Sequence, residues 1–187
     1  METTKKNSFW QSAVIGLKLL LICAIVAAVV AFVYELTLDK ANENINATKS
    51  EKICEIFGMD GLTMEAKAES ADAIVYGVKD SEGTLIGYCA ETASPGFGGD
   101  ISILVGYDEK ATIVGVRIVS MSETPGVGSK VNVADYLNQY AGKSGALTLG
   151  QDVDAISGAT ISSDALMNGV NKANEALAKA LENGGAQ

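Results

Sequence analysis

The run Ile101–Met121, ISILVGYDEKATIVGVRIVSM, decides the fold of this 187-residue chain. Two stretches rich in β-branched residues, Ile101–Tyr107 and Thr112–Met121, lie on either side of the polar tetrapeptide Asp108–Ala111. Strand-forming runs separated by such a turn are typical of a β-hairpin. The sequence therefore predicts two antiparallel strands here, around which the other elements are placed.

A second hairpin is predicted upstream. Ala73–Val78 and Thr84–Glu91 have a similar composition and are separated by the turn-like segment Asp80–Gly83. The glycine-rich segment Ser94–Gly99 joins the two hairpins, and the polar, mixed residues 58–72 are interpreted as a loop. Four strands connected in this order predict a twisted antiparallel sheet.

Helices are predicted before and after the sheet. Glu35–Phe57 lacks glycine and proline and predicts a helix that Gly58 ends. Val133–Tyr140 predicts a short helix. From Ser162 to Glu182 apolar residues recur every three or four positions, which indicates an amphipathic helix lying on the sheet. These residues are Leu166, Val170, Ala173, Leu177 and Leu181. The predicted fold class is α+β.

The segment Ala13–Tyr34 is apolar except for Lys18 and predicts a membrane anchor. It makes roughly 33 Å of helix, and the hydrocarbon core of a bilayer is about 30 Å thick. Lysines precede the segment and acidic residues follow it, which predicts a cytoplasmic N-terminus and a domain on the outer side of the cytoplasmic (inner) membrane. We expect an anchor over residues 1–34, a helical linker over 35–57 and a domain over 58–187. A cleaved signal peptide is the alternative.

The composition excludes several classes of function. With 14 Lys plus Arg against 23 Asp plus Glu, the formal charge of −9 argues against nucleic-acid binding. The absence of histidine excludes a histidine general base and a histidine-ligated metal or haem. Cys23, Cys54 and Cys89 form no C-x-x-C pair. We expect Cys54 and Cys89 to be free thiols, with one disulfide between them as the alternative.

The segment Asp154–Thr160, DAISGAT, precedes the predicted C-terminal helix. Gly158 and Ala159 have little or no side chain, so a bulky group can approach the backbone closely. Thr160 and Ser162 lie at N-cap distance from the helix, where free N–H groups and the helix dipole favour a phosphate. On these residues alone, an ordinary capped helix is the alternative.

The pattern Asp-x-x-Ser/Thr-Gly-Ala-Ser/Thr in Asp154–Thr160 resembles the flavinylation motif of the FMN-binding domain family. Ser122–Gly128, SETPGVG, is similar to the family's Glu-Thr-Pro-Gly-Leu-Gly loop, with Val127 in place of leucine. Relatives often have a basic residue or histidine just before this loop, where the present chain has Met121 and Ser122. Gly87-Tyr88, Gly98-Gly99 and the run Ile101–Val116 resemble the family's sheet.

The resemblance implies that FMN is joined by a phosphoester bond to Thr160, placed there by a dedicated flavin transferase. It assigns residues 58–187 to the FMN-binding domain. It also implies a set of cofactor-binding residues around the two motifs. These are Ser157, Gly158, Ala159, Ile161, Ser162, Glu123, Thr124, Gly126 and Gly128.

The single anchor and the short length resemble the G subunits of Rnf complexes, which are ion-pumping ferredoxin:NAD⁺ oxidoreductases. The resemblance implies an electron-transfer subunit of a translocase, with other membrane redox subunits as partners and no complete activity alone. The C subunits of Na⁺-translocating NADH:quinone oxidoreductases are similar but usually longer. Three alternatives are an FMN subunit of a complex like these NADH:quinone oxidoreductases, a free-standing anchored flavoprotein of extracellular electron transfer, and a non-redox binding module that has kept the fold.

Overall fold

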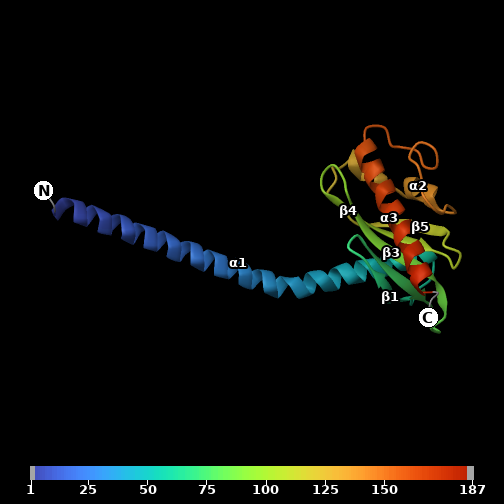
Figure 1. Cartoon of the computed structure of the whole chain (residues 1–187), viewed down its shortest axis with the longest axis horizontal. Helices are drawn as coiled ribbons and strands as arrows, with labels where there is room; N and C mark the ends of the chain where they lie inside the picture. The colour runs from blue at the N-terminus through green and yellow to red at the C-terminus, as the bar shows by residue number, and fades with distance from the viewer. Residues whose placement is uncertain (1–2, 185–187) are drawn as a thin grey trace. The chain divides into compact units, whose positions relative to one another are not determined.

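The computed structural model describes residues 3–184, which contain five strands and a long helix at each end (Figure 1). The elements are α1 (Thr3–Phe57), β1 (Thr63–Glu69), β2 (Ala73–Lys79), β3 (Leu85–Pro95), β4 (Asp100–Tyr107), β5 (Ile113–Ser120), η1 (Gly128–Asn132), α2 (Ala134–Leu137), η2 (Asn138–Tyr140) and α3 (Thr160–Gly184). The chain divides into two compact units between Asn46 and Ala47. The α+β fold class is confirmed.

The first unit holds the candidate membrane span. Val14–Glu35, within α1, has a mean hydropathy of 2.8, and its side chains are exposed. The segment is long and apolar enough to cross a bilayer. Its bounds differ by one residue from the predicted anchor Ala13–Tyr34.

The second unit is built on a five-stranded sheet with the order β1-β2-β3-β4-β5, in which every neighbouring pair is antiparallel. The four predicted strands are confirmed, but the interpretation of residues 58–72 as a loop is wrong for β1. This edge strand carries charged residues at 65, 67 and 69 and has a register shift between Ala66 and Ala68. Charges and bulges are common on edge strands, where they discourage pairing with other chains.

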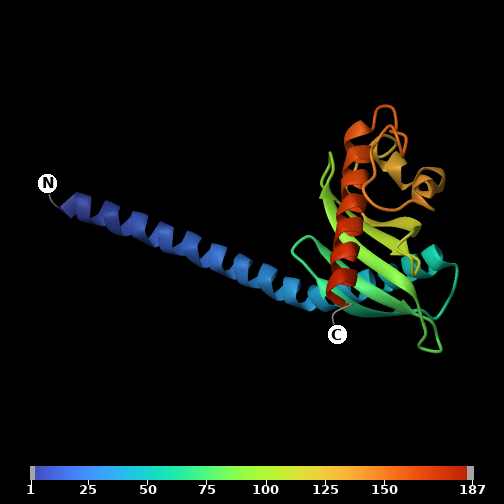
Figure 2. The same cartoon turned by 45° about the vertical axis from the view of Figure 1, so that its right-hand side comes forward.

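One face of the sheet is covered by α3, which crosses it as the red helix in Figure 2. Side chains alternate between the two faces of a strand, so Ile103 and Val105 of β4 share this face. They pack in one cluster with Leu166 and Val170 of α3. A Cβ on Gly169 would overlap Cδ1 of Ile103, so this glycine lets α3 approach the strand closely.

The opposite face is covered by the last turns of α1. Ile53 and Ile56 are buried there with Val78, Cys89 and Leu104. The predicted end of this helix is confirmed, because Gly58 has φ +66° and its N–H donates to the Cys54 carbonyl at 2.8 Å. Both Cys54 and Cys89 are free, in agreement with the prediction.

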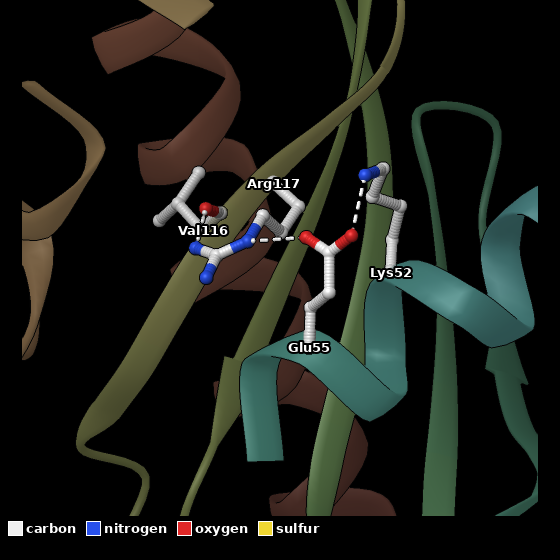
Figure 3. A network of polar contacts seen from close by, with 4 residues as sticks. All are labelled: Lys52, Glu55, Val116 and Arg117. Atoms are coloured by element: carbon white, nitrogen blue, oxygen red, sulfur yellow. Dashed lines mark hydrogen bonds and ion pairs between the residues drawn. The ribbon is translucent and has the colours of Figure 1, made fainter. Parts of the chain in front are cut away.

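A polar network ties the same turns of α1 to β5 (Figure 3). Nε of Arg117 donates to Glu55 at 3.0 Å, and Nζ of Lys52 bonds to the same carboxylate at 2.7 Å. Both bonds hold the pKa of Glu55 below its ordinary value, and the bond from Lys52 contributes most. Another ion pair joins Lys49 to Glu91 of β3 at 2.8 Å. The residues from Ala47 to Phe57 are therefore part of the folded domain.

Candidate functional site

A cavity of about 350 Å³ lies where the two motif segments of the sequence meet. Its walls come from the loop after β5, from the turn that leads into α3 and, at Phe97, from the loop between β3 and β4. The residues that line the cavity are Phe97, Glu123, Thr124, Val127, Gly128, Gly158, Ala159, Thr160, Ile161 and Ser162. The fold thus brings together lining residues, such as Gly128 and Gly158, that are thirty positions apart in the sequence.

The start of α3 differs from the prediction. The helix begins at Thr160, two residues before the expected Ser162, so Thr160 occupies the first helical position and Ala159 precedes it. The turn before it is closed by a bond from the Ala159 N–H to the Ile156 carbonyl at 2.9 Å, and Gly158 takes φ +80°. This glycine lets the chain reverse direction directly before the helix, a conformation that other residues rarely adopt.

The first turn of α3 leaves backbone donors free. The Ser163 N–H donates to the Ala159 carbonyl at 2.9 Å. Within the described residues, no protein acceptor faces the N–H groups of Thr160, Ile161 and Ser162. Free N–H groups and the positive end of the helix dipole together favour an anion at this position. Ser163, which no sequence motif indicated, also accepts a bond from the Ile156 N–H at 3.1 Å and steadies the turn.

The loop Glu123–Gly128 forms a second wall. The Val127 N–H donates to the Thr124 carbonyl at 3.2 Å, and Gly126 between them has φ +76°. Proline followed by glycine with a positive φ is typical of a type II turn. Ser129 closes the turn, because its Oγ accepts a bond from the Gly126 N–H at 2.8 Å.

Glu123 is a buried carboxylate at the base of this loop, with 8% of its surface exposed. Its Oε1 accepts bonds from the N–H groups of Phe97 (2.8 Å) and Gly98 (3.1 Å), and its Oε2 accepts one from the Ser162 hydroxyl (2.7 Å). Burial raises the pKa of Glu123, but the three donated bonds outweigh burial and leave this pKa below its ordinary value. Glu123 is therefore ionised at neutral pH.

Eight of the ten predicted cofactor-binding residues line the cavity. Ser157 and Gly126 do not: Ser157 is exposed in the turn before α3, and Gly126 is exposed in the turn after Pro125. Two lining residues, Phe97 and Val127, were not predicted from the sequence. Both are large apolar residues that stand between two glycines in loop segments, Phe97 between Gly96 and Gly98 and Val127 between Gly126 and Gly128. That position in the sequence was the signal that could have identified them.

The cavity combines four features. Thr160 supplies an exposed hydroxyl, and the first turn of α3 supplies N–H donors. Phe97, Val127 and Ile161 supply apolar walls, and Glu123 is the single ionisable residue among the ten that line it. This arrangement suits a ligand with one phosphate and a flat, largely apolar body. It provides no acid–base pair for proton transfer.

A larger hollow, of about 790 Å³, follows the polar side of α3. Three polar side chains along it already have partners. Asn171 bonds to both the N–H and the carbonyl of Leu147, Asn174 donates to the Gly145 carbonyl, and Lys172 donates to the Ala93 carbonyl. The smaller cavity is therefore the better candidate site.

Comparisons with known proteins agree with this choice. The family model of the FMN-binding domain matches residues 96–175, which include every residue that lines the cavity. The G subunit of the ion-translocating oxidoreductase complex from Haemophilus influenzae (strain PittEE) is 30% identical over 168 residues, covering 79% of this chain and 80% of that protein. Its counterpart from Methanosarcina acetivorans is 31% identical over 167 residues, covering 83% and 88%.

Two further relatives extend the comparison. The G subunit of the Na⁺-translocating ferredoxin:NAD⁺ oxidoreductase complex from Acetobacterium woodii is 31% identical over 140 residues, covering 69% of this chain and 63% of that protein. The crystal structure of the C subunit of the Na⁺-translocating NADH-quinone reductase from Parabacteroides distasonis matches with a TM-score of 0.50 and 24% identity. It covers 58% of this chain and 62% of that one, and it supports the fold. From these relationships, the chain belongs to the family of G subunits of ion-translocating oxidoreductase complexes and contains an FMN-binding domain.

Proposed function

We propose that the chain is the FMN-carrying electron-transfer subunit of a membrane ion-translocating ferredoxin:NAD⁺ oxidoreductase, with FMN attached through its phosphate to Thr160. Family membership and the name of the Acetobacterium woodii relative support the complex. The candidate span Val14–Glu35 supports membrane attachment. The single observation that carries the proposal is the cavity in which the two flavin motifs meet.

The lining residues fit FMN. The cavity volume of about 350 Å³ lies within the range of small-molecule sites, roughly 300–1,000 Å³. The free N–H groups of Thr160, Ile161 and Ser162 suit the phosphate, and the apolar side chains of Phe97 and Val127 suit the ring. When bound, FMN supplies the electron transfer. The chain positions the ring and needs no general base, in keeping with its lack of histidine.

Thr160 is favoured over Ser157 as the attachment residue. Thr160 lines the cavity and begins the helix, so a phosphate on its Oγ lies next to the N–H donors of the first turn. Ser157 lies within the tight turn that the bond between Ile156 and Ala159 closes, and it does not line the cavity. In the attachment, a flavin dinucleotide would supply the FMN: a bond would form between Thr160 Oγ and the FMN phosphorus while the bond between that phosphorus and the leaving mononucleotide breaks. The leaving group departs with the hydroxyl proton.

The test is the mass of the chain after co-expression with a flavin transferase. We expect the parent chain to gain the mass of one FMN less one water, and Thr160→Ala to lose this gain while remaining folded. The variant should fold because Thr160 is exposed and alanine is favoured in a helix. Ser157→Ala is the matched control and should remain loaded. Peptide mass spectrometry that finds FMN on Ser157, or on the Thr160→Ala chain, would contradict the assignment.

The complex is tested separately from the cofactor. We expect the chain to purify with other membrane redox subunits and to oxidise neither NADH nor ferredoxin alone. Membranes that lack it should lose coupled ferredoxin:NAD⁺ activity.

The second candidate is an NADH:quinone complex, whose C subunits this chain also resembles in its motifs. Loss of NADH:quinone activity, with ferredoxin:NAD⁺ activity intact, would favour that candidate. A chain that carries FMN but purifies alone would indicate a free-standing flavoprotein.

A further inference from the structure

The carboxylate of Glu123 joins three segments that are distant in the sequence. It binds the backbone of the loop between β3 and β4 through the Phe97 and Gly98 N–H groups, and it binds α3 through the Ser162 hydroxyl. Glu123 itself belongs to the loop after β5. All three segments contribute lining residues to the cavity. One side chain therefore connects every wall of the site.

Glycines surround this carboxylate on two sides. A Cβ on Gly96 would overlap Oε1 of Glu123, and a Cβ on Gly128 would overlap Oε2. The space next to each oxygen is thus filled by glycine backbone, which leaves the carboxylate little freedom to move. A carboxylate that accepts three hydrogen bonds and is closely enclosed fixes the relative positions of the groups that it binds.

Resting on the proposed function, we propose that Glu123 is a positioning residue for flavin attachment. By bonding to Phe97 and to Ser162 at once, it sets the separation between the exposed Phe97 ring and the first turn of α3, on which Thr160 lies. Phe97 is 70% exposed, and it belongs neither to the apolar cluster under α3 nor to the one under the last turns of α1. Without Glu123, nothing within the described residues bonds the Phe97 and Gly98 N–H groups. The bond from the Gly96 N–H to the Gly99 carbonyl at 2.9 Å still closes the loop, but the loop loses its hydrogen bonds to the other walls of the cavity.

The mechanism predicts which substitutions are tolerated. In Glu123→Gln, the amide oxygen can accept the Phe97 and Gly98 N–H bonds, while the amide NH₂ donates to Oγ of Ser162. The geometry is then kept although the charge is lost. In Glu123→Leu, the side chain has a similar size but accepts no bond, so the Phe97 and Gly98 N–H groups lose their protein partner. Ser162→Ala removes only the bond to α3.

The experiment uses the full chain co-expressed with a flavin transferase and sampled before loading of the parent is complete. Intact mass gives the fraction loaded, and iodide quenching of the flavin fluorescence gives the accessibility of the ring. We expect Glu123→Leu to load about tenfold less than the parent, and its loaded fraction to be quenched more strongly. Glu123→Gln should stay within about twofold of the parent, with Ser162→Ala between the two.

Val78→Ala is the control for stability. Val78 is buried on the opposite face of the sheet, so its truncation destabilises the domain without touching the cavity. We expect Val78→Ala to load like the parent despite a lower melting temperature. If Glu123→Leu folds too poorly to load, Ser162→Ala carries the test.

The failures of the two proposals are distinguishable. A parent chain that takes up no FMN, or takes it up elsewhere than Thr160, refutes the proposed function. A parent loaded at Thr160 together with Glu123→Leu or Ser162→Ala loaded equally refutes only the role of Glu123. Equal losses in Glu123→Gln and Glu123→Leu also overturn it, because the charge and not the geometry would then be decisive. If loading follows melting temperature across all variants, Val78→Ala included, the proposal is overturned, because Glu123 then only stabilises the fold.

Discussion

Removal of the last turns of α1 is expected to unfold the FMN-binding domain. The perturbation is a pair of fragments, residues 47–187 and residues 58–187, which differ only in the turns that cover the second face of the sheet. Residues 35–57 were predicted as a linker, and a linker could be removed without loss. In the structure, Ile53 and Ile56 are 1% and 7% exposed and pack on the sheet.

The magnitude follows from what these turns bury. Full burial of an isoleucine side chain stabilises by about 1.5–3 kcal/mol, and the half-buried Phe57 adds part of a similar amount. The partly exposed ion pairs with Arg117 and Glu91 add at most about 1 kcal/mol each. A loss of roughly 4–8 kcal/mol compares with a total stability of about 5–15 kcal/mol for most domains. The shorter fragment also exposes Val78, Cys89 and Leu104.

The assay is urea unfolding followed by circular dichroism, with a heteronuclear NMR spectrum as a check of tertiary structure. We expect a cooperative transition for residues 47–187, and either none or a much lower midpoint for residues 58–187. Ile53→Ala in the longer fragment should lower the free energy of unfolding by about 2–5 kcal/mol, because it removes part of the apolar contact that the shorter fragment loses entirely. Equal midpoints for the two fragments would refute the assignment of these turns to the core.

The remaining predictions concern the cavity loop and the membrane. Gly128→Ala should destabilise the domain by about 1–3 kcal/mol and reduce FMN loading, because its Cβ would overlap the Glu123 carboxylate. Gly126→Ala should cost about 1–2 kcal/mol through its positive φ alone and should leave loading intact, since nothing lies within 4 Å of the added atom. Urea midpoints measure the stability of both variants, and intact mass measures their FMN loading. A larger loading defect in Gly126→Ala than in Gly128→Ala would contradict this prediction. Protease added to intact spheroplasts should remove the domain after Tyr34, whereas digestion only in inverted vesicles would show the opposite orientation.

The sequence predicted the elements that have a strong local pattern. The central strands and the amphipathic helix from Leu166 to Leu181 are confirmed, because alternation and helical periodicity reflect burial on one face. The strand Thr63–Glu69 was not predicted because most side chains of this edge strand are exposed. Its sequence therefore lacks the regular apolar positions that indicate a strand. The start of α3 was misplaced by two residues because Ala159 precedes the helix, where a serine, threonine or aspartate would have been the usual signal.

The candidate site was predictable in its residue types but not in how those residues are connected. Glu123 and Ser162 both belong to segments that resemble flavin motifs, which predicted that each contacts the cofactor. In the structure they bond to each other across 39 positions of sequence, and Glu123 also bonds to the loop at Phe97, 26 positions away. No local pattern encodes bonds of that range. A motif residue can therefore serve the cofactor by holding the walls of its cavity, and Thr160 and Glu123 are expected to fail in different ways when each is replaced.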